Sequence, residues 1–407
     1  MYKSNIKYSC LRSQFLEDNQ YNKEVVLAIS VPANSSRLFS SVEEAKSQPT
    51  ALLRLESYVG PANEGYLFNK QFDLTKIKHD SSYCAENQFH EENSWKNVLT
   101  VLERLKQNSR YIQVIDIGCG QGEIVAKCER VGISAIGFDP TLRQTSSKLI
   151  KDYYSAKSLR AQDLHDSNAL HVFVMRCVLP HINNPLEFLN DIFNEFPTSV
   201  IYLEFQNLDR ILKCKAWYSF MHDHVNYFTI DSFRSYNTID SGNFGEWSWV
   251  CLSARSLHAA VCDSYAKDPR NFVSNSSSAD KSRGGGNWMA MLAEAESVIE
   301  QQQQSLNQIS QLVMNSTLVV YSAAGKGINF SYAAEISGLF VNIIAVDVSE
   351  NRHGKFMECS GVQILSLDEF SKTNKSTAGV VILNKEHWGY ARNRLDRTNI
   401  FITLPIG

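Results

Sequence analysis

Apolar and polar positions alternate in blocks through the middle of the chain. Apolar runs of strand length occupy residues 114–117, 135–139, 171–179 and 199–204. Patterns of helical period lie before and between them, at about 92–105, 122–130 and 185–195. Strands that alternate with helices in this way predict a doubly wound, mainly parallel α/β sheet.

The two ends of the chain differ from this central block. Residues 1 to about 85 carry short β-like runs between polar turns, which predicts a small, mainly β module. Near the other end, strand material around 249–252 gives way to a polar stretch at 274–286 with the composition of a loop or linker. We therefore predict three domains, at 1–85, 86–265 and 266–407.

The last domain begins with a helix at 288–314 and then repeats the pattern of the central one. A strand at 317–321, a glycine turn at 322–327, a helix from about 328 and a strand at 341–347 that ends in Asp follow one another, with a later strand at 379–383. This weak repeat predicts a Rossmann-like α/β domain.

A glycine-rich turn follows the first strand of the central domain, in the segment V-I-D-I-G-C-G-Q-G-E at 114–123. Gly118, Gly120 and Gly122 lack the Cβ atoms that would keep a nucleotide from the backbone, and Asp116 can orient a ligand or the loop. The spacing D-x-G-x-G-x-G is not the dinucleotide pattern G-x-G-x-x-G, and it resembles the first motif of class I S-adenosylmethionine (SAM) methyltransferases. A tight connection from strand to helix, without a ligand, is the alternative.

Asp139 ends the next predicted strand, about 20 positions downstream, where βαβ units place an acid that binds ribose hydroxyls. A solvated Asp at a strand end is the alternative. We predict that the cofactor contacts Asp116, Gly118, Cys119, Gly120, Gly122, Asp139 and Pro140.

Histidines mark two later segments. His181 follows the strand at 171–179, at the carboxyl end where open α/β sheets place their ligands. His222, Asp223 and His224 lie among aromatic residues at 217–229, which suits an acid/base site better than a surface loop. His-x-His could also bind a metal, but no further residues at metal-ligand spacing follow.

Gly325 and Lys326 lie in the second glycine turn, at a predicted helix start. Free N–H groups and a cation there predict contact with a substrate phosphate, whereas a lysine on a surface turn is the alternative. A dehydrogenase that binds a dinucleotide at this turn is disfavoured, because the turn lacks the G-x-G-x-x-G spacing.

Composition excludes several classes of partner. The chain of 407 residues has 43% hydrophobic and 20% charged residues and a net charge of −3, without a basic run, so we expect no nucleic acid partner. No apolar stretch is long enough for a membrane span and no signal peptide is visible, so we expect a cytoplasmic monomer or homodimer. The nine cysteines are dispersed without a C-x-x-C pair, which indicates reduced thiols.

Together, these segments resemble the three-part SAM-dependent C-methyltransferases of nucleotide-linked keto-deoxysugars. V-L-P-H-I at 178–182 matches that family's V-L-x-H-I, and D-H-V-N-Y-F at 223–228 resembles its E-H-x-S-Y-F. The turn at 323–327 resembles its C-terminal domain, and L-A-I-S-V-P-A-N-S at 27–35 is similar to its small zinc-binding domain. The resemblance implies SAM as co-substrate and a nucleotide-linked sugar as the acceptor.

The sequence departs from this family at several positions. Only Cys10 lies where the first zinc-binding cysteine pair is found, and 53–58 has no cysteine for the second, so we expect the N-terminal domain to fold without zinc. The family's tyrosine, glutamate and asparagine near the histidines are Met221, Asp223 and Cys177 here.

The resemblance implies that His224 is the base that removes a proton beside the ketone and generates an enolate. A neutral imidazole suits this step, with Asp223 able to set its tautomer. His181 or Tyr227 is predicted to donate to the enolate oxygen.

We predict that the substrate contacts Met221, Asn226, Gly325 and Lys326. Two other functions stay open: an O-methyltransferase that acts on a saccharide or related small molecule, and a SAM-binding protein without catalysis.

Overall fold

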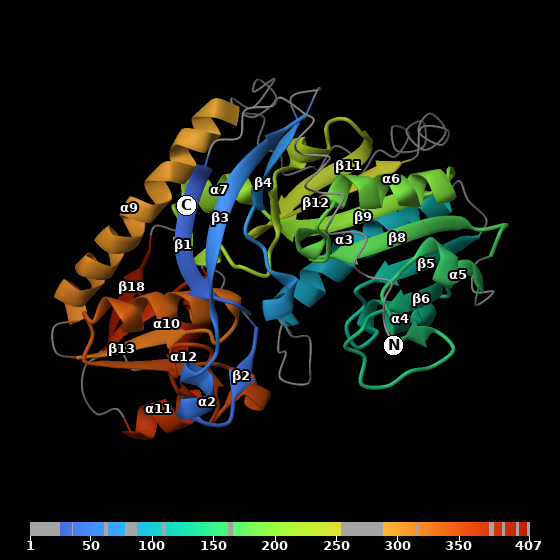
Figure 1. Cartoon of the computed structure of the whole chain (residues 1–407). Coiled ribbons are helices and arrows are strands. Elements are labelled where there is room, and N and C mark those ends of the chain that lie inside the picture. Colours follow the sequence, from blue (N-terminus) through green and yellow to red (C-terminus); the bar gives the residue numbers. More distant parts are fainter. Residues whose placement is uncertain are drawn as a thin grey trace.

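The computed structural model describes residues 25–34, 36–60, 64–77, 88–107, 111–161, 166–253, 288–313, 316–373, 378–384, 387–395 and 399–404. Its largest sheet has seven strands in the order β11-β12-β9-β8-β5-β6-β7 (Figure 1). The parallel strands are β5 (Ile112–Ile117), β6 (Ser134–Phe138), β7 (Leu149–Ile150), β8 (Leu170–Arg176) and β9 (Val200–Gln206). The hairpin of β11 (Asn237–Phe244) and β12 (Trp247–Ser253) extends the sheet antiparallel to β9.

The order of these strands reverses at β5, because the chain goes first to β6 on one side and later to β8 on the other. Open α/β sheets bind ligands beyond the carboxyl ends of the strands at such a switch point. The accompanying helices are α3 (Gln88–Lys106), α4 (Glu123–Arg130), α5 (Ala156–Ala161), α6 (Pro185–Glu195) and α7 (Leu208–Lys213).

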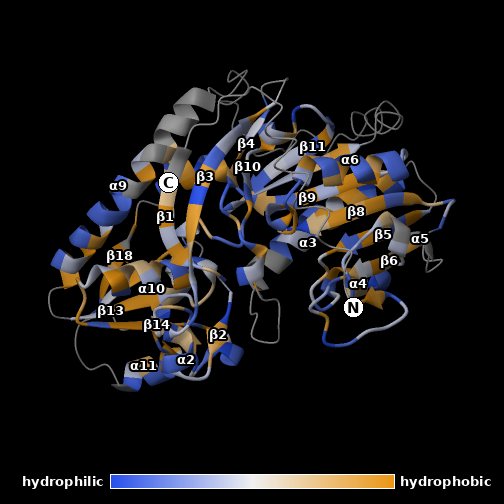
Figure 2. Cartoon of the chain, viewed as in Figure 1, coloured by the Kyte–Doolittle hydropathy of each residue, from blue (hydrophilic) through white to orange (hydrophobic). Residues whose placement is uncertain are grey.

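Alternate residues of the parallel strands face two separate cores. Ile115 and Phe173 belong to the core on one face, and Val114 and Val172 to the core on the other. Because both faces are covered, the strands are apolar along most of their length, as their orange colour in Figure 2 shows.

A smaller antiparallel sheet has the order β1-β3-β4-β10. Strands β1 (Val25–Pro32), β3 (Thr50–Val59) and β4 (Gly65–Asn69) come from the N-terminal region, but β10 (Asn226–Phe228) follows the histidine segment of the central region. The histidine segment is thus fixed at one end by the N-terminal sheet.

The C-terminal sheet is fully parallel, in the order β16-β14-β13-β17-β18. Its strands are β13 (Thr317–Tyr321), β14 (Asn342–Val346), β16 (Ile364–Leu365), β17 (Gly379–Ile382) and β18 (Ile400–Thr403). Its helices are α9 (Trp288–Val313), α10 (Gly325–Ser337), α11 (Leu367–Thr373) and α12 (Trp388–Arg394), and α9 also packs against β1 (Figure 1).

N-terminal and C-terminal segments also pair directly. Strand β2 (Leu38–Phe39), which precedes α2 (Val42–Lys46), forms an antiparallel ribbon with β15 (Phe356–Met357). Short 3-10 helices complete the chain: η1 (Leu74–Lys76), η2 (Leu179–His181), η3 (Trp217–Ser219), η4 (Ile230–Phe233) and η6 (Glu350–Arg352). Within the ranges given above, no helix has both the length and the apolarity to cross a bilayer.

The predicted α/β class is confirmed, and so are most of the predicted central elements. One correction concerns the strand expected at 171–179: it ends at Arg176, because Cys177 has a left-handed backbone (φ 59°) and 179–181 form η2. Strand β10 was not foreseen. The polar stretch at 274–286 and Cys10 lie outside the described residues, and the three domain boundaries stay predictions.

A buried carboxyl group joins the N-terminal and C-terminal segments next to β15. Oε1 of Glu358 accepts hydrogen bonds from the backbone N (3.3 Å) and the side-chain amide (3.4 Å) of Asn34. Oε2 has no hydrogen-bond partner among the described residues. Burial raises the pKa of Glu358 to about 8, although the bonds from Asn34 and the charge of Arg37 oppose this.

The first prediction concerns this carboxyl group. In the unfolded chain the Glu358 carboxyl group ionises near its ordinary pKa of 4.5. In the folded protein it keeps its proton up to about pH 8. The wild type should therefore lose stability relative to Glu358→Gln as pH rises between these values, by up to about 1.4 kcal/mol per pH unit. Urea denaturation of both proteins at pH 5 and pH 7.5 measures the difference.

Glu350→Gln is the matched control, because Glu350 is exposed in η6. The difference in unfolding free energy between this variant and the wild type should stay constant from pH 5 to pH 7.5, because the substituted carboxyl group is exposed. A difference between the wild type and Glu358→Gln that stays constant from pH 5 to pH 7.5 contradicts the prediction.

Candidate active site

Three glycines with left-handed backbone connect β5 to α4. Gly118, Gly120 and Gly122 have φ angles of 71°, 57° and 89°, which other residues adopt only at a cost. A Cβ on Gly118 would lie 2.3 Å from Cγ2 of Val178, and one on Gly122 would lie 2.6 Å from a methyl carbon of Leu149. A Cβ on Gly120 would meet no atom within 4 Å, so this glycine faces open space at the start of α4.

Asp116 lies in β5, two residues before the turn, with its side chain fully buried. Neither carboxylate oxygen has a hydrogen-bond partner among the described residues. Burial raises the pKa of Asp116 to about 6, although the nearby charge of Arg176 opposes this. A buried carboxylate without hydrogen bonds is costly, and this indicates that a ligand supplies the missing partner.

Asp139 follows β6, and its carboxylate holds the glycine turn. Oδ2 accepts a hydrogen bond from the backbone N of Gly120 (2.8 Å). Oδ1 accepts two more, from the backbone N (2.7 Å) and the hydroxyl (2.6 Å) of Thr141. Three bonds are therefore made within the protein, and the ribose role of Asp139 stays a prediction.

The two remaining residues predicted to contact the cofactor flank this arrangement. The buried side chain of Cys119 lies against Gly137 in β6, and burial raises its pKa strongly. Its thiol thus contributes to packing of the turn. Pro140 is partly exposed in the turn between Asp139 and Thr141.

The second glycine turn shares one contact with the first but differs in its backbone, since Ser322 has a positive φ and neither Gly325 nor Gly327 does. Oδ2 of Asp347 accepts a hydrogen bond from the backbone N of Ala323 (2.7 Å), as Asp139 does from Gly120. Asp347 also forms a buried ion pair with Arg352 (3.0 Å). Its charge is thus balanced inside the protein, unlike that of Asp116.

Lys326, predicted to meet a phosphate, forms an ion pair with Glu246 in the turn between β11 and β12. Gly325 is the first residue of α10, three positions earlier than the predicted helix start. Lys326 lines a pocket described below.

The two predicted histidines lie next to each other. The rings of His181 and His224 are nearly perpendicular, with their centroids 4.8 Å apart. Nδ1 of His181 lies 2.7 Å from the carbonyl oxygen of Asp223, so Nδ1 carries the proton. In the neutral ring Nε2 then has a free lone pair.

His224 is held in its neutral form. Burial, together with the positive charge that His181 can carry, lowers the pKa of His224 to about 4. The buried carboxylate of Asp223 acts in the opposite direction and does not compensate. A neutral imidazole at this position can accept a proton throughout the physiological pH range.

Two hydrogen bonds of the Tyr227 hydroxyl fix the histidine segment. The hydroxyl accepts a hydrogen bond from the backbone N of Met221 (2.6 Å) and donates one to the carbonyl oxygen of the same residue (2.8 Å). Because the single phenolic proton is used, Tyr227 cannot also donate to an enolate in this arrangement, and our expectation for it is revised. Met221 is itself buried, and its backbone forms both of these hydrogen bonds.

Asn226 also connects the histidine segment to the end of η2. Its side-chain amide donates to the carbonyl oxygen of Ile182 (2.6 Å), the residue after His181. Its Oδ1 is buried without a hydrogen-bond partner among the described residues. Asn226 therefore positions the end of η2, and its predicted contact with the substrate stays a prediction.

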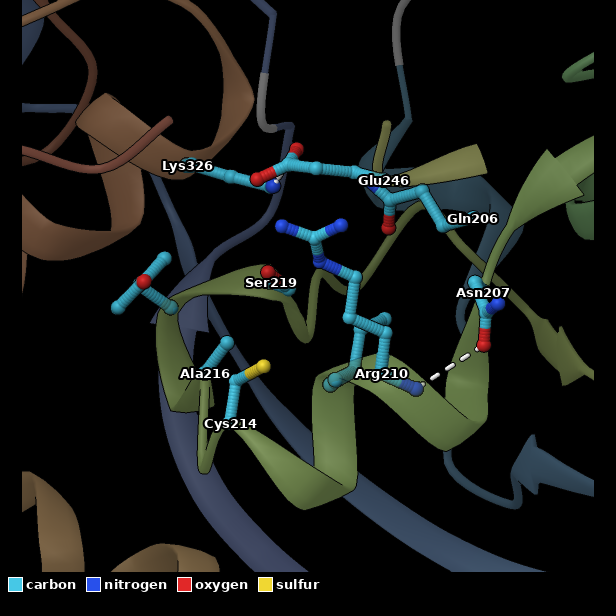
Figure 3. A pocket seen from close by; sticks show the side chains of 10 residues that line it. Gln206, Asn207, Arg210, Cys214, Ala216, Ser219, Glu246 and Lys326 are labelled. Atoms are coloured by element: carbon cyan, nitrogen blue, oxygen red, sulfur yellow. Dashed lines mark hydrogen bonds and ion pairs between the residues drawn. The ribbon is translucent and has the colours of Figure 1, made fainter. Parts of the chain in front are cut away.

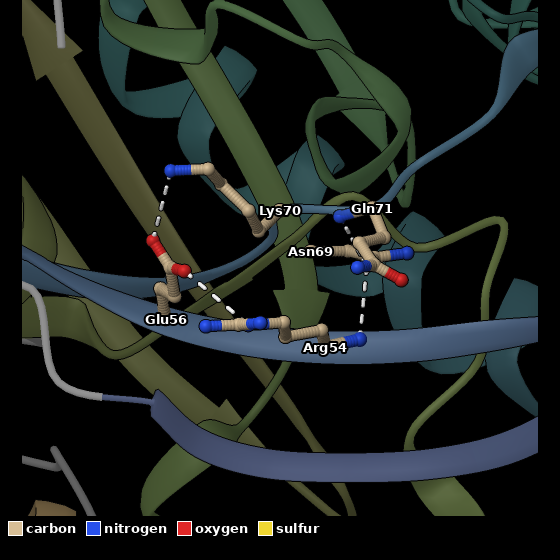
Figure 4. A network of polar contacts seen from close by, with 5 residues as sticks. All are labelled: Arg54, Glu56, Asn69, Lys70 and Gln71. Atoms are coloured by element: carbon tan, nitrogen blue, oxygen red, sulfur yellow. Dashed lines mark hydrogen bonds and ion pairs between the residues drawn. The ribbon is translucent and has the colours of Figure 1, made fainter. Parts of the chain in front are cut away.

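Asn69, which the sequence did not single out, ties the N-terminal sheet to the histidine segment. Its Oδ1 accepts from the backbone N atoms of Arg54 and Gln71, both at 3.2 Å (Figure 4). Its amide nitrogen lies 3.1 Å from Nδ1 of the buried His222. An asparagine at a strand end gives no local sign of such a contact, because His222 is 153 positions away.

The structure thus brings most of the predicted residues into two adjoining groups. Val178, which packs against Gly118, is the residue before η2, and His181 is the last residue of η2. The short segment 178–181 therefore packs against the glycine turn at one end and carries His181 at the other. No group of three or more His, Cys, Asp or Glu side chains suited to a metal occurs in the part of the chain that the structure describes.

Comparison with known proteins identifies the central region. Residues 88–238 match a family model described as a methyltransferase domain. No curated protein matches the chain significantly.

Three solved structures are similar to between 37% and 42% of this chain. A SAM-dependent methyltransferase from Anabaena variabilis ATCC 29413 has 14% identity and a TM-score of 0.28, with 39% of this chain and 84% of that chain covered. The plantazolicin methyltransferase BpumL, in complex with a triazolic desmethylPZN analog and SAH, has 18% identity, a TM-score of 0.27 and coverages of 37% and 62%. The PH0226 protein from Pyrococcus horikoshii OT3 has 14% identity, a TM-score of 0.26 and coverages of 42% and 93%.

Similarities at this level carry no argument about substrates. The family model and the sheet order, with its glycine turn at the switch point, support one conclusion. Residues 88–238 of the chain form a methyltransferase domain.

Proposed function

We propose that this protein transfers the methyl group of SAM to a carbon of a nucleotide-linked keto-deoxysugar. The observation that carries the proposal is the buried Asp116, whose carboxylate has no hydrogen-bond partner among the described residues. It lies beside three left-handed glycines, and η2 connects their turn to a neutral histidine. The acceptor class rests on the sequence resemblance, and the residues of the site are consistent with it.

SAM supplies positive charge near the buried carboxylate of Asp116. Its sulfonium and ammonium groups are positive, so its approach favours the ionised form of Asp116 and offsets the cost of burying that carboxylate. The open space at Gly120 allows the nucleoside part to approach the backbone. Asp139 can receive a ribose hydroxyl on its remaining lone pair while it holds the turn.

His224 is the proposed base. Its imidazole accepts the proton from the carbon next to the ketone, and the electron pair left on that carbon forms an enolate. The enolate carbon then attacks the methyl group of SAM, and the C–S bond breaks to leave the neutral thioether. Positioning both substrates in one cleft accounts for a large part of the acceleration of such a displacement.

His181 is the proposed donor to the enolate oxygen, since the proton of Tyr227 is used by Met221. It can donate from Nε2 in its protonated form, because its Nδ1 proton is directed to the carbonyl oxygen of Asp223. The positive charge of protonated His181 keeps His224 neutral before the reaction. His224 is then in the form that accepts a proton while His181 is in the form that donates one.

A prediction for the cofactor site compares two glycines. Gly120 and Gly132 both have left-handed φ angles, and a Cβ on either meets no atom within 4 Å. Gly120→Ala and Gly132→Ala should therefore each cost about 1 kcal/mol of stability. Only Gly120→Ala should weaken SAM binding, by tenfold or more, because its methyl group enters the cofactor space.

Isothermal titration of both variants with SAM measures this effect. Unfolding measurements verify that the two substitutions have similar costs. Equal SAM affinities of the two variants contradict the assignment of the turn.

A prediction for catalysis concerns the base. His224→Asn should reduce turnover at least 1,000-fold, in line with the loss of a general base and its positioning, and leave SAM affinity within about threefold. His171→Asn is a control, because His171 is buried in β8 near Phe196 and away from the histidine pair. Near-normal turnover by the His224 variant contradicts its role as base.

The reaction itself separates the proposal from its alternatives. SAM with a labelled methyl group is incubated with nucleotide-linked keto-sugars and hydroxy-sugars in D₂O. C-methylation requires the ketone and is accompanied by exchange of the proton on the neighbouring carbon. Label on oxygen indicates an O-methyltransferase, and binding of SAM without transfer to any sugar indicates a protein without this catalysis; either result contradicts the proposal.

A further inference from the structure

Because β9 and β5 run in the same direction, a polar pocket at the carboxyl end of β9 lies at the same end of the strands as the glycine turn. It is enclosed by the end of β9, by α7, by η3, by the β11–β12 turn and by the first turn of α10 (Figure 3). Its polar side chains are those of Gln206, Asn207, Arg210, Ser219, Glu246 and Lys326.

Two buried polar atoms at this pocket lack hydrogen bonds. Ser219 is fully buried, and its hydroxyl has no partner among the described residues. Gln206 is 8% exposed, and its Oε1 is likewise without a partner. Buried polar atoms are normally satisfied, so two of them around one pocket indicate a polar ligand.

The charges around the pocket favour an anion. Figure 3 shows the Arg210 guanidinium extending from α7 toward Glu246, and it makes one hydrogen bond, from Nη1 to the carbonyl oxygen of Gly245 (2.6 Å). Lys326 is paired with Glu246, so the two cations and one carboxylate leave one net positive charge. The remaining donors of a guanidinium match the geometry of phosphate oxygens.

Helix α10 adds to this field. Its N-cap is Ala324, which offers no side-chain bond to the first turn, and Lys326 projects from that turn. The partial positive charge at the start of a 13-residue helix therefore adds to Arg210 and Lys326.

The same helix fixes the wall of the pocket. The side-chain amide of Asn329 donates to the carbonyl oxygens of Tyr218 (3.3 Å) and Phe220 (2.7 Å), on either side of Ser219. Ser219 belongs to the loop that continues to His224. The pocket and the histidine pair are therefore parts of one ordered segment.

We propose that this pocket binds the diphosphate of a nucleoside diphosphate-linked acceptor, through Arg210, Ser219 and Lys326. The inference rests on the proposed function for the nature of the acceptor. Anion entry replaces Glu246 as the partner of Lys326. Strand β9 is two strands from β5, or about 10 Å across the sheet, so a linked sugar can extend from here toward the methyl donor.

Binding assays on the full chain without SAM test the subsite, with inorganic pyrophosphate and uridine diphosphate as probes. Arg210→Gln should weaken binding of both probes at least tenfold. Ser219→Ala should weaken it about threefold without lowering the melting temperature, because the hydroxyl that it removes makes no hydrogen bond to the part of the chain that the structure describes. Arg234→Gln, which removes a surface arginine paired with Asp231, should leave binding unchanged.

Uridine diphosphate should bind at least tenfold more tightly than pyrophosphate, since the nucleoside adds contacts that a free anion lacks. Equal affinity of the two probes contradicts the diphosphate-linked acceptor. Absence of binding at 10 mM, or binding that Arg210→Gln and Ser219→Ala leave unchanged, contradicts the subsite. Because SAM is absent from these assays, such a failure is distinct from a failure of methyl transfer, which turnover measures.

Discussion

Val178 lies so close to the backbone of Gly118 that a Cβ there would be 2.3 Å from its Cγ2. This packing fixes the segment after β8 against the glycine turn after β5. His181 follows at the end of η2, and its Nδ1 binds the carbonyl oxygen of Asp223, next to His224. One van der Waals contact and one hydrogen bond thus link the glycine turn to the histidine pair.

The histidine segment is stabilised from the N-terminal sheet as well. Strand β10 completes that sheet, and the amide of Asn69 reaches His222. The C-terminal region contributes Asn329, which binds the backbone on either side of Ser219, and Glu358, which binds Asn34. All three parts of the chain therefore hold the loop between β9 and β10, although residues 88–238 alone match the methyltransferase domain model.

The sequence predicted the features that local pattern encodes. The glycine turn was predictable because strand, turn and helix follow one another within a dozen residues, and left-handed backbone requires glycine there. The roles of individual polar groups were not, because they depend on distant partners. Lys326 and Glu246 are 80 positions apart, and Asn34 and Glu358 are 324 apart. Tyr227 was expected to donate to substrate, but its proton goes to Met221, a local bond that apolar and polar patterns do not predict.

We propose that SAM binds at the turn after β5, where neither carboxylate oxygen of Asp116 has a hydrogen-bond partner among the described residues, and that the glycine turn after β13 has another role. Amide hydrogen exchange with and without S-adenosylhomocysteine tests this directly. The amides of residues 117–122 should exchange at least tenfold more slowly in the complex, whereas those of 322–327 should change little. Protection at 322–327 without protection at 117–122 would contradict the claim.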